Sequence, residues 1–225
     1  MGPTVSGVGV VDKSLSLVAA IAERPLSLAE LVERTGLSRA TVHRLAVALE
    51  AHGLLRRTAE GRFALGLHLV ALGRAATEQF PLAEVGAPAL SQLRDETGES
   101  VQLYVRDGER RVCIAALESP HGLRTIVPVG AALPMDRGSA GRVLSGESTR
   151  QGWVQTVEER EPGVASVSAP VRGADGSLAA AVSVSGPIDR LGRAPGRRHG
   201  DAVLAAAASI ERALRGPEGV GGTGR

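Results

Sequence analysis

S-L-A-E-L-V-E-R-T-G-L-S-R-A-T-V-H-R-L-A-V-A-L-E, residues 27–50, is the stretch that decides the fold of the N-terminal part of this chain. Ser27 followed three residues later by Glu30 has the form of a capping box and predicts the start of a helix. Gly36 ends that helix because glycine adopts positive φ readily, and Ser38 caps a second helix that continues to the end of the stretch. Two short helices joined by a tight turn are typical of a helix-turn-helix.

The segments on either side of this pair complete a winged helix-turn-helix. Upstream, apolar residues from 15 to 22 follow helical spacing, and Pro25 ends that helix. Downstream, residues 54–58 and 63–65 predict two short strands around a turn that contains glycine. The sequence therefore predicts a DNA-binding domain over residues 10–66.

The second helix of the pair has the composition of a recognition helix. Its outward N-terminal positions are polar or small, and its first acidic residue is Glu50, near its far end. N-terminal residues of such a helix contact base edges, where arginine reads guanine and threonine contacts bases, while hairpin arginines reach the phosphate backbone. The predicted DNA-binding residues are Ser27, Ser38, Arg39, Thr41, His43, Arg44, Arg56, Arg57 and Arg62.

The same pattern also fits a three-helix bundle with a solvated polar face, and His43 fits either a DNA contact or a surface position. The charge distribution is compatible with DNA binding. The first 65 residues hold eight basic and six acidic groups, whereas the rest hold 18 of each, a bias that statistical scatter also produces.

Composition predicts an ordinary soluble protein. The chain has 225 residues, of which 43% are hydrophobic and 22% charged. No run of about 18 apolar residues is present, so no membrane span is expected, and the N-terminus lacks the pattern of a signal peptide. Cys113 is the single cysteine, which fits a reducing compartment, and we therefore expect a cytoplasmic protein.

The pattern changes after residue 66. Residues 67–80 predict a linker helix, and residues 81–216 a second domain in which strands alternate with flanking helices. The helices are expected at about 83–97, 139–144 and 200–215, and the strands at 100–106, 111–117, 123–129, 164–172 and 178–185. This order predicts an α+β fold around a largely antiparallel sheet. Residues 1–9 are predicted to be disordered and residues 217–225 to form a flexible tail.

Serines recur in the last two predicted strands. Ser166 and Ser168 share one strand face, as do Ser183 and Ser185, because side chains alternate across a strand. Paired hydroxyls on an apolar strand suit a small polar ligand. They equally suit a core strand whose hydroxyls bond backbone carbonyls.

Catalytic patterns are absent from the sequence. The five histidines are scattered, and no G-x-S-x-G, H-E-x-x-H or Gly-rich phosphate loop is present. Cys113 lies in an apolar strand and is expected to be structural, and the acidic cluster of Glu158, Glu159 and Glu161 is expected to be a solvated loop. We expect no enzyme activity, no metal site and no cofactor.

Taken together, these stretches resemble the IclR family of bacterial regulators. The similarity rests on S-G-V-G-V-V-D-K-S-L-S-L at 6–17, on residues 26–45, on G-R-F-A-L-G at 61–66 and on L-R-D-E-T-G-E-S-V-Q-L-Y at 93–104. It continues through residues 152–172 and A-A-V-S-V-S-G-P-I at 180–188. The stretch E-P-G-V-A-S-V-S-A-P-V at 161–171 is similar to the corresponding stretch of the actinomycete regulators of amino-acid metabolism of the NdgR or LtbR type. Those regulators act on leucine-biosynthesis genes.

The resemblance implies a regulator, such as a repressor, that binds a palindromic double-stranded operator as a homodimer or a dimer of dimers. It also implies a GAF-like effector domain that binds a small organic acid or amino acid. Ser139 and Ala140, at the start of a helix, would present backbone N–H groups to a carboxylate. The effector residues that the resemblance implies are Leu123, Ile126, Leu133, Met135, Ser139, Ala140, Val164, Ser166, Ser183 and Ser185.

One departure from the family pattern concerns the effector domain. The family has a substantial helical segment before the Gly152-Trp153 strand, whereas here residues 139–144 run into that strand after a few residues. A shortened cover over the pocket leaves an alternative open, in which the C-terminal domain only oligomerises or docks a partner and binds no effector.

Overall fold

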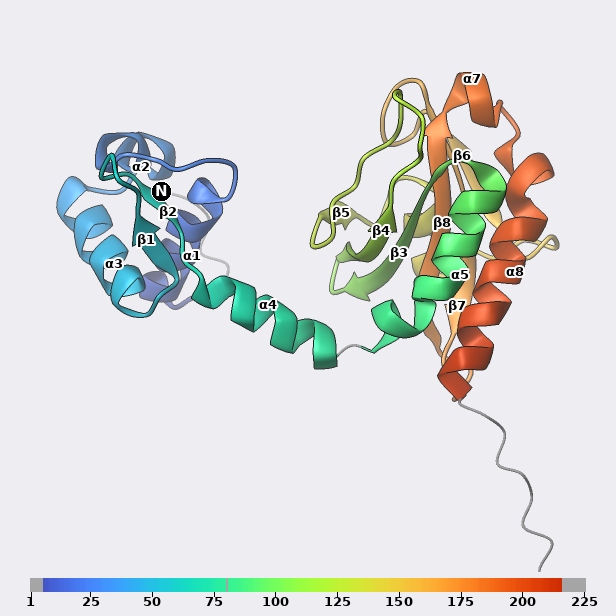
Figure 1. The fold of residues 1–225 in the computed structure, drawn as a ribbon, viewed down its shortest axis with the longest axis horizontal. Coiled ribbons are helices and arrows are strands. Elements are labelled where there is room, and N and C mark those ends of the chain that lie inside the picture. Colours follow the sequence, from blue (N-terminus) through green and yellow to red (C-terminus); the bar gives the residue numbers. More distant parts are fainter. Residues whose placement is uncertain (1–5, 80, 216–225) are drawn as a thin grey trace, which may run out of the picture. The chain divides into compact units, whose positions relative to one another are not determined.

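The computed structural model describes residues 6–79 and 81–215, and the chain divides into two compact units, Met1–Phe80 and Pro81–Arg225 (Figure 1). The disorder expected at residues 1–5 and the tail expected at 217–225 lie outside the described residues. Ser6 is described, and its backbone N–H and hydroxyl both donate to Asp12 Oδ1, at 3.0 and 2.9 Å.

The first unit is a winged helix-turn-helix followed by one more helix, as Figure 1 shows in blue to teal. Its elements are α1 (Gly9–Ile21), α2 (Leu28–Thr35), α3 (Arg39–Ala51), β1 (Leu55–Arg57), β2 (Phe63–Leu65) and α4 (His68–Gln79). Ser27 and Glu30 form the predicted capping box, and Gly36 ends α2 in the left-handed region at φ 67°. The local signals in residues 27–50 are therefore confirmed.

The core of this unit joins α1, α2 and α3 to the hairpin. Leu17, Leu31, Val42 and Phe63 are fully or almost fully buried together. Phe63 exchanges two backbone hydrogen bonds with Leu26, at 2.8 and 2.9 Å, so the segment before α2 pairs with β2 as a single bridge. The helix-turn-helix and its wing are thus one packed body.

The second unit is the predicted α+β domain. Its helices are α5 (Leu82–Thr97), α6 (Ser139–Leu144), α7 (Ile188–Leu191) and α8 (Pro195–Arg215). Its strands are β3 (Ser100–Asp107), β4 (Arg110–Leu117), β5 (Ala132–Pro134), β6 (Val154–Val157), β7 (Val164–Arg172) and β8 (Leu178–Pro187). The strands form one antiparallel sheet in the order β5-β4-β3-β8-β7-β6. Helices α5 and α8 lie side by side along it (Figure 1).

The two faces of the sheet differ in chemistry. Residues such as Val101, Val167 and Val182 face α5 and α8 and form the main core. Because side chains alternate along a strand, the next residues, such as Gln102 and Ser168, lie on the opposite face. Helix α6 packs on that opposite face, against β7 and β8. The face that carries Gln102 and Ser168 is therefore separated from the main core by the thickness of the sheet.

One predicted strand was wrong, one helix began too late, and β5, β6 and α7 were not among the predicted ranges. Residues 123–129 form a loop and not a strand, because β4 pairs with β5 instead and Pro128 has no N–H to donate. Helix α7 was missed because it is too short to show a periodic pattern, and α8 begins earlier than predicted, at Pro195.

No helix among residues 6–79 and 81–215 is long and apolar enough to cross a membrane.

Candidate nucleic-acid interface and effector site

The N-terminal end of α3 is held by its cap. Ser38 Oγ accepts a hydrogen bond from the backbone N–H of Thr41 at 3.3 Å, and the two side-chain oxygens lie 2.9 Å apart. Such a cap satisfies one of the free N–H groups of the first turn. Ser27 performs the same task for α2, at 3.3 Å from the backbone nitrogen of Glu30. Both predicted serines are thus helix caps in this structure.

One face of α3 is exposed and cationic. Val42 and Leu45 point into the core, whereas Arg39, His43 and Arg44 are exposed. The side chains of Arg39 and Arg44 have no hydrogen-bond or ion-pair partner among the described residues. Two guanidinium groups are therefore available to an external acceptor on the first two turns of this helix.

The three arginines predicted for the wing are engaged differently. Arg57 lies over the Phe63 ring, 4.2 Å from its centroid, and its Nε is 3.4 Å from a Glu50 carboxylate oxygen. Arg62 Nη1 donates to Glu30 Oε2 at 2.9 Å. Arg56 is exposed and has no such partner among the described residues. The structure therefore leaves only Arg56 of these three without an internal carboxylate.

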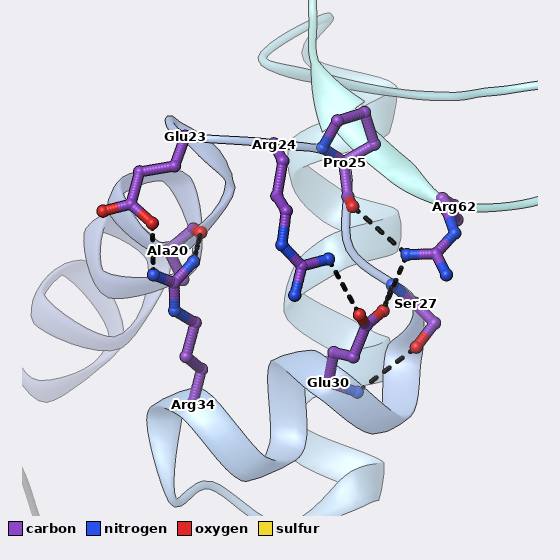
Figure 2. Close-up of polar contacts among 8 residues, drawn as sticks. All are labelled: Ala20, Glu23, Arg24, Pro25, Ser27, Glu30, Arg34 and Arg62. Carbon is purple, nitrogen blue, oxygen red and sulfur yellow. Dashed lines mark hydrogen bonds and ion pairs between the residues drawn. The ribbon is translucent and has the colours of Figure 1, made fainter.

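Glu30 is the centre of a polar cluster at the start of α2 (Figure 2). Its Oε2 accepts from the Ser27 backbone N–H at 2.7 Å as well as from Arg62, and its Oε1 accepts from Arg24 at 2.8 Å. The Ser27 backbone N–H, and then Arg24, lower the pKa of the Glu30 carboxyl to about 2. Arg62 also donates to the Pro25 carbonyl at 3.3 Å, which links the hairpin to the segment before α2.

Hydroxyl groups form a connected network in the second unit, between α6 and the face of the sheet opposite α5 and α8. Ser139, the first residue of α6, has its Oγ 2.8 Å from that of Ser166 and 2.7 Å from that of Ser168. Ser168 and Ser183 are 2.9 Å apart, and Ser166 is 3.0 Å from Thr156 Oγ1. The shared faces predicted for the serine pairs are confirmed, and the hydroxyls bond one another across strands.

A narrow hollow opens beside this network. It leaves about 20 Å³ for the centres of water-sized molecules. Its lining residues are Gln102, Tyr104, Arg111, Gly138, Ser139, Ala140, Thr156, Glu159, Arg160, Val164, Ser166, Ser183 and Ser185. Six of the ten effector residues that the sequence suggested are among them. Most of the lining residues carry a polar side chain.

Arg111 is the most unusual residue of this lining, because the whole residue is only 2% exposed. Its Nη1 donates to the carbonyl of Pro134 and, at 2.7 Å, to that of Arg137. Its Nε–H is buried with no hydrogen-bond partner, and it has no ion pair with a carboxylate among the described residues. Burial lowers the pKa of the guanidinium.

Arg160 adds a second cation to the hollow. Its Nη2 is buried without a hydrogen-bond partner and lies 3.6 Å from the exposed Glu161 carboxylate. Glu159 also lines the hollow, but its carboxylate is paired with other groups. It accepts hydrogen bonds from Arg142 Nε and from the Gly138 backbone N–H, both at 3.1 Å. The expectation of a solvated loop does not hold for Glu159, which is half-buried and ordered by these bonds.

Four predicted effector residues lie outside the serine hollow. Leu123 and Ile126 line a separate, wider hollow of about 550 Å³ and remain largely exposed, since their segment is a loop. Leu133 is half-buried on β5, and Met135 is buried against α6. The apolar wall implied by the resemblance is therefore not assembled around the serines.

Sequence reasoning missed several residues that line the hollow. Gln102 and Tyr104 alternate with buried valine and leucine on β3, which was a usable signal for the face opposite α5 and α8. Arg111 lies at the start of the apolar strand β4, where a charged residue is expected to be exposed unless its partners are known. Cys113 is buried as expected, and burial raises the pKa of its thiol to about 11. Among the described residues no group of three His, Cys, Asp or Glu is placed to hold a metal.

These two units define a class of protein: a DNA-binding regulator with a separate α+β domain. The IclR helix-turn-helix domain model matches residues 10–59, and the model of the bacterial transcriptional regulator IclR C-terminal domain matches residues 74–150 and 146–212. The chain therefore belongs to the IclR family of bacterial transcriptional regulators. As the sequence predicted, these are regulators and not enzymes.

Known relatives and structures agree with this assignment. The HTH-type transcriptional regulator KipR of Bacillus subtilis (strain 168) is 31% identical over 135 residues, 60% of this chain and 54% of KipR, so the match spans about half of that relative. The glycerol operon regulatory protein of Streptomyces griseus is 28% identical over 85% of this chain and 90% of its own. An IclR homolog from Microbacterium hydrocarbonoxydans, solved with 4-hydroxybenzoate, has the same fold at a TM-score of 0.78 and 19% identity, over 92% of this chain and all of that one.

Proposed function

We propose that this chain binds a palindromic operator as a homodimer or a dimer of dimers, with the N-terminal half of α3 in the major groove. The observation that carries the proposal is the exposed face of Arg39, His43 and Arg44, whose arginines have no partner within the part of the chain that the structure describes. Thr41 adds a hydroxyl at the same end of the helix. Arg56 provides a contact to the phosphate backbone from the wing. Arg57 and Arg62 are not assigned a DNA contact, because carboxylates hold them.

Self-association is supported by apolar residues that the first unit leaves exposed. Val10 and Leu15 on α1, and Val70 on α4, are all more than half exposed. Exposed apolar residues grouped on helices mark interaction surfaces in many proteins. A second copy of the chain would bury them and would place two recognition helices on the two halves of a palindrome.

The serine hollow is the proposed effector site, and its ligand is a small anion. Arg111 carries a buried charge that carbonyls and the Tyr104 ring face but that no carboxylate among the described residues neutralises, and its Nε–H has no acceptor there. A buried charge without a counter-ion is costly, and an anion would compensate it. Arg160 lies in the same lining. Ser139 and Ala140 would bring the first N–H groups of α6 to the same ligand, and Ser166, Ser183 and Ser185 would bring hydroxyls.

The size and polarity of the hollow narrow the class of ligand. Room of about 20 Å³ admits little more than one water-sized centre, so a ligand must be small or must displace side chains. The homolog from Microbacterium hydrocarbonoxydans was solved with an aromatic acid. Here the many hydroxyl, amide and charged side chains in the lining favour a small oxo, hydroxy or amino acid over an aromatic one. The short connection from Leu144 to Val154 contributes no residue to the lining of this hollow.

A role in amino-acid metabolism, as a repressor, is the finer part of the proposal. It is supported by the stretch E-P-G-V-A-S-V-S-A-P-V at residues 161–171. Most of this stretch lies in β7, which brings Ser166 and Ser168 into the hydroxyl network. The stretch that resembles the NdgR or LtbR regulators therefore coincides with part of the hollow.

The experiment is a fluorescence-anisotropy titration of the full chain against its own upstream DNA and against scrambled DNA, at several salt concentrations. Preferential and salt-sensitive binding of the upstream DNA is the expected result. Equal binding of all sequences at every salt concentration would contradict operator recognition. The same assay then screens small oxo, hydroxy and amino acids for a change in affinity.

A matched pair of variants tests the effector site. Arg111→Gln removes the buried charge, whereas Arg110→Gln removes an exposed charge from the neighbouring position of β4. An acid that shifts operator affinity should act on the wild type and on the Arg110 variant but not on the Arg111 variant. If it acts equally on all three, the anion binds elsewhere.

The tightness of the hollow also favours a second candidate function, in which the C-terminal domain only oligomerises. In that case no small acid changes operator affinity. The wild type, Arg110→Gln and Arg111→Gln would then all lack a response to acids, while analytical ultracentrifugation would still show that the chain self-associates.

A further inference from the structure

Glu30 holds two arginines that flank the helix-turn-helix. Arg24 comes from the segment before α2, and Arg62 comes from the hairpin, yet both guanidinium groups donate to the same carboxylate, at 2.8 and 2.9 Å (Figure 2). The side chains of both arginines remain about half exposed, at 57% and 42%. They are therefore within reach of solvent and of another anion, but an internal acid already neutralises them.

We propose that Glu30 lowers the affinity of this chain for DNA of any sequence by keeping Arg24 and Arg62 on itself, and thereby raises the discrimination of operator from other DNA. The inference rests on the DNA-binding function proposed above. It assigns to the capping-box glutamate a role in specificity in addition to its role in starting α2.

The physical basis is the competition between a carboxylate and DNA phosphates for the same cations. Sequence-independent binding comes almost entirely from phosphate neutralisation, and each phosphate contact steepens the logarithmic salt dependence by about 0.9. Contacts to base edges carry the sequence information. A residue that withholds two arginines from phosphates thus weakens binding to all DNA, and it leaves the contribution of Arg39 and Arg44 to the operator intact.

The carboxylate is an effective competitor because it is fixed in place. The Ser27 backbone N–H holds Glu30 Oε2 at 2.7 Å, so the acid loses little freedom when it pairs with the arginines. A glutamine at this position still accepts from the Ser27 N–H through its amide oxygen, so the helix cap is retained. Glu30→Gln therefore separates the cap from the charge.

The test compares Glu30→Gln with Glu33→Gln in the full chain. Glu33 lies on the same helix, is exposed and has no ion-pair partner among the described residues, so its variant makes the same change in net charge without releasing an arginine. Affinity for scrambled DNA and for the upstream operator DNA is measured by anisotropy at several salt concentrations.

Glu30→Gln should bind scrambled DNA more tightly than Glu33→Gln does, with a salt slope steeper by about one to two. Its ratio of operator to scrambled affinity should fall. Equal behaviour of the two variants would overturn the inference, because the effect would then be net charge alone. If the wild type binds no DNA at all, the proposed function fails instead, and the two outcomes are distinguishable.

A second variant keeps the inference testable if Glu30→Gln does not fold. Replacing both Arg24 and Arg62 by glutamine in the presence of Glu30 should leave the salt slope at its wild-type value, since these arginines do not neutralise phosphates in the wild type. A slope shallower by about two would show that both arginines already contact DNA and would refute the proposal.

Discussion

Arg190 on α7 donates from Nε and Nη2 to the two carboxylate oxygens of Glu99, at 2.6 and 2.8 Å. The Glu99 side chain is only 4% exposed. In the sequence, Glu99 directly precedes β3 and Arg190 follows the end of β8. This paired geometry joins two chain segments that are distant in sequence, at the point where β3 and β8 are hydrogen-bonded neighbours.

Removal of Arg190 should destabilise the second unit. Arg190→Ala leaves the Glu99 carboxylate buried and unpaired, which costs about 3 kcal/mol in the free energy of unfolding. Urea unfolding followed by the fluorescence of Trp153, the single tryptophan, measures it. Arg197→Ala, an exposed arginine of α8, is the control and should change little. Replacing Glu99 and Arg190 together by leucine should cost less than Arg190→Ala, and a larger cost would argue against the buried-charge explanation.

The arginines of α3 and of the wing should affect DNA binding in different ways. Arg39→Ala and Arg44→Ala should each weaken operator binding by about 1–3 kcal/mol and relax the preference at one base position. Arg56→Ala should weaken binding to all sequences alike and make the salt slope shallower by about one. Competition assays with operators that carry single base changes measure both. Unchanged operator affinity in both α3 variants would remove α3 from the interface.

Gly200 is required by the indole of Trp153. A Cβ at Gly200 would lie 2.3 Å from Trp153 Nε1, so Gly200→Ala overpacks the contact between α8 and the residue before β6. Alanine normally stabilises a helix relative to glycine, but here we expect a loss of about 1–3 kcal/mol in the free energy of unfolding. Trp153→Leu in the same chain should recover part of that loss, as followed by circular dichroism. A variant as stable as the wild type would contradict this packing.

The lowered pKa of Glu30 predicts an acid-sensitive contribution to the stability of the first unit. A carboxyl whose folded pKa is depressed stabilises the fold above its unfolded pKa, ordinarily near 4.5, and loses that contribution as the pH falls towards about 2. Urea unfolding monitored by circular dichroism at pH 7, 4 and 3 should show a decline in the wild type. Glu30→Gln should lack that component, whereas Glu33→Gln should retain it. Parallel pH curves for all three proteins would disprove the assignment.

Local signals in the sequence were sufficient to predict the first unit. Ser27 with Glu30, Gly36 and Ser38 each specify a helix boundary through bonds to residues within a few positions. Residues 123–129 show the opposite case, because their conformation depends on which segment completes the edge of the sheet beyond β4. The segment that pairs with β4 is Ala132–Pro134, and the local sequence pattern does not indicate this pairing.

The candidate effector site was predictable only where alternation along a strand applied. Ser166 and Ser183 were found because a strand puts every second residue on one face. Arg111 was not, since its burial depends on the carbonyls of Pro134 and Arg137, which are more than twenty positions away. The internal partners of Arg62 were missed for the same reason.

The backbone bridge between Leu26 and Phe63 affects how the DNA-binding domain would respond to the shape of DNA. Because Phe63 pairs with Leu26 on one side and with Arg57 on the other, the hairpin cannot bend independently of the helices. The spacing between the start of α3 and Arg56 is therefore set before DNA arrives. A duplex whose groove width or bend does not match that spacing must deform to fit, and the cost depends on its sequence. We therefore expect the chain to discriminate by indirect readout at base pairs that it does not touch.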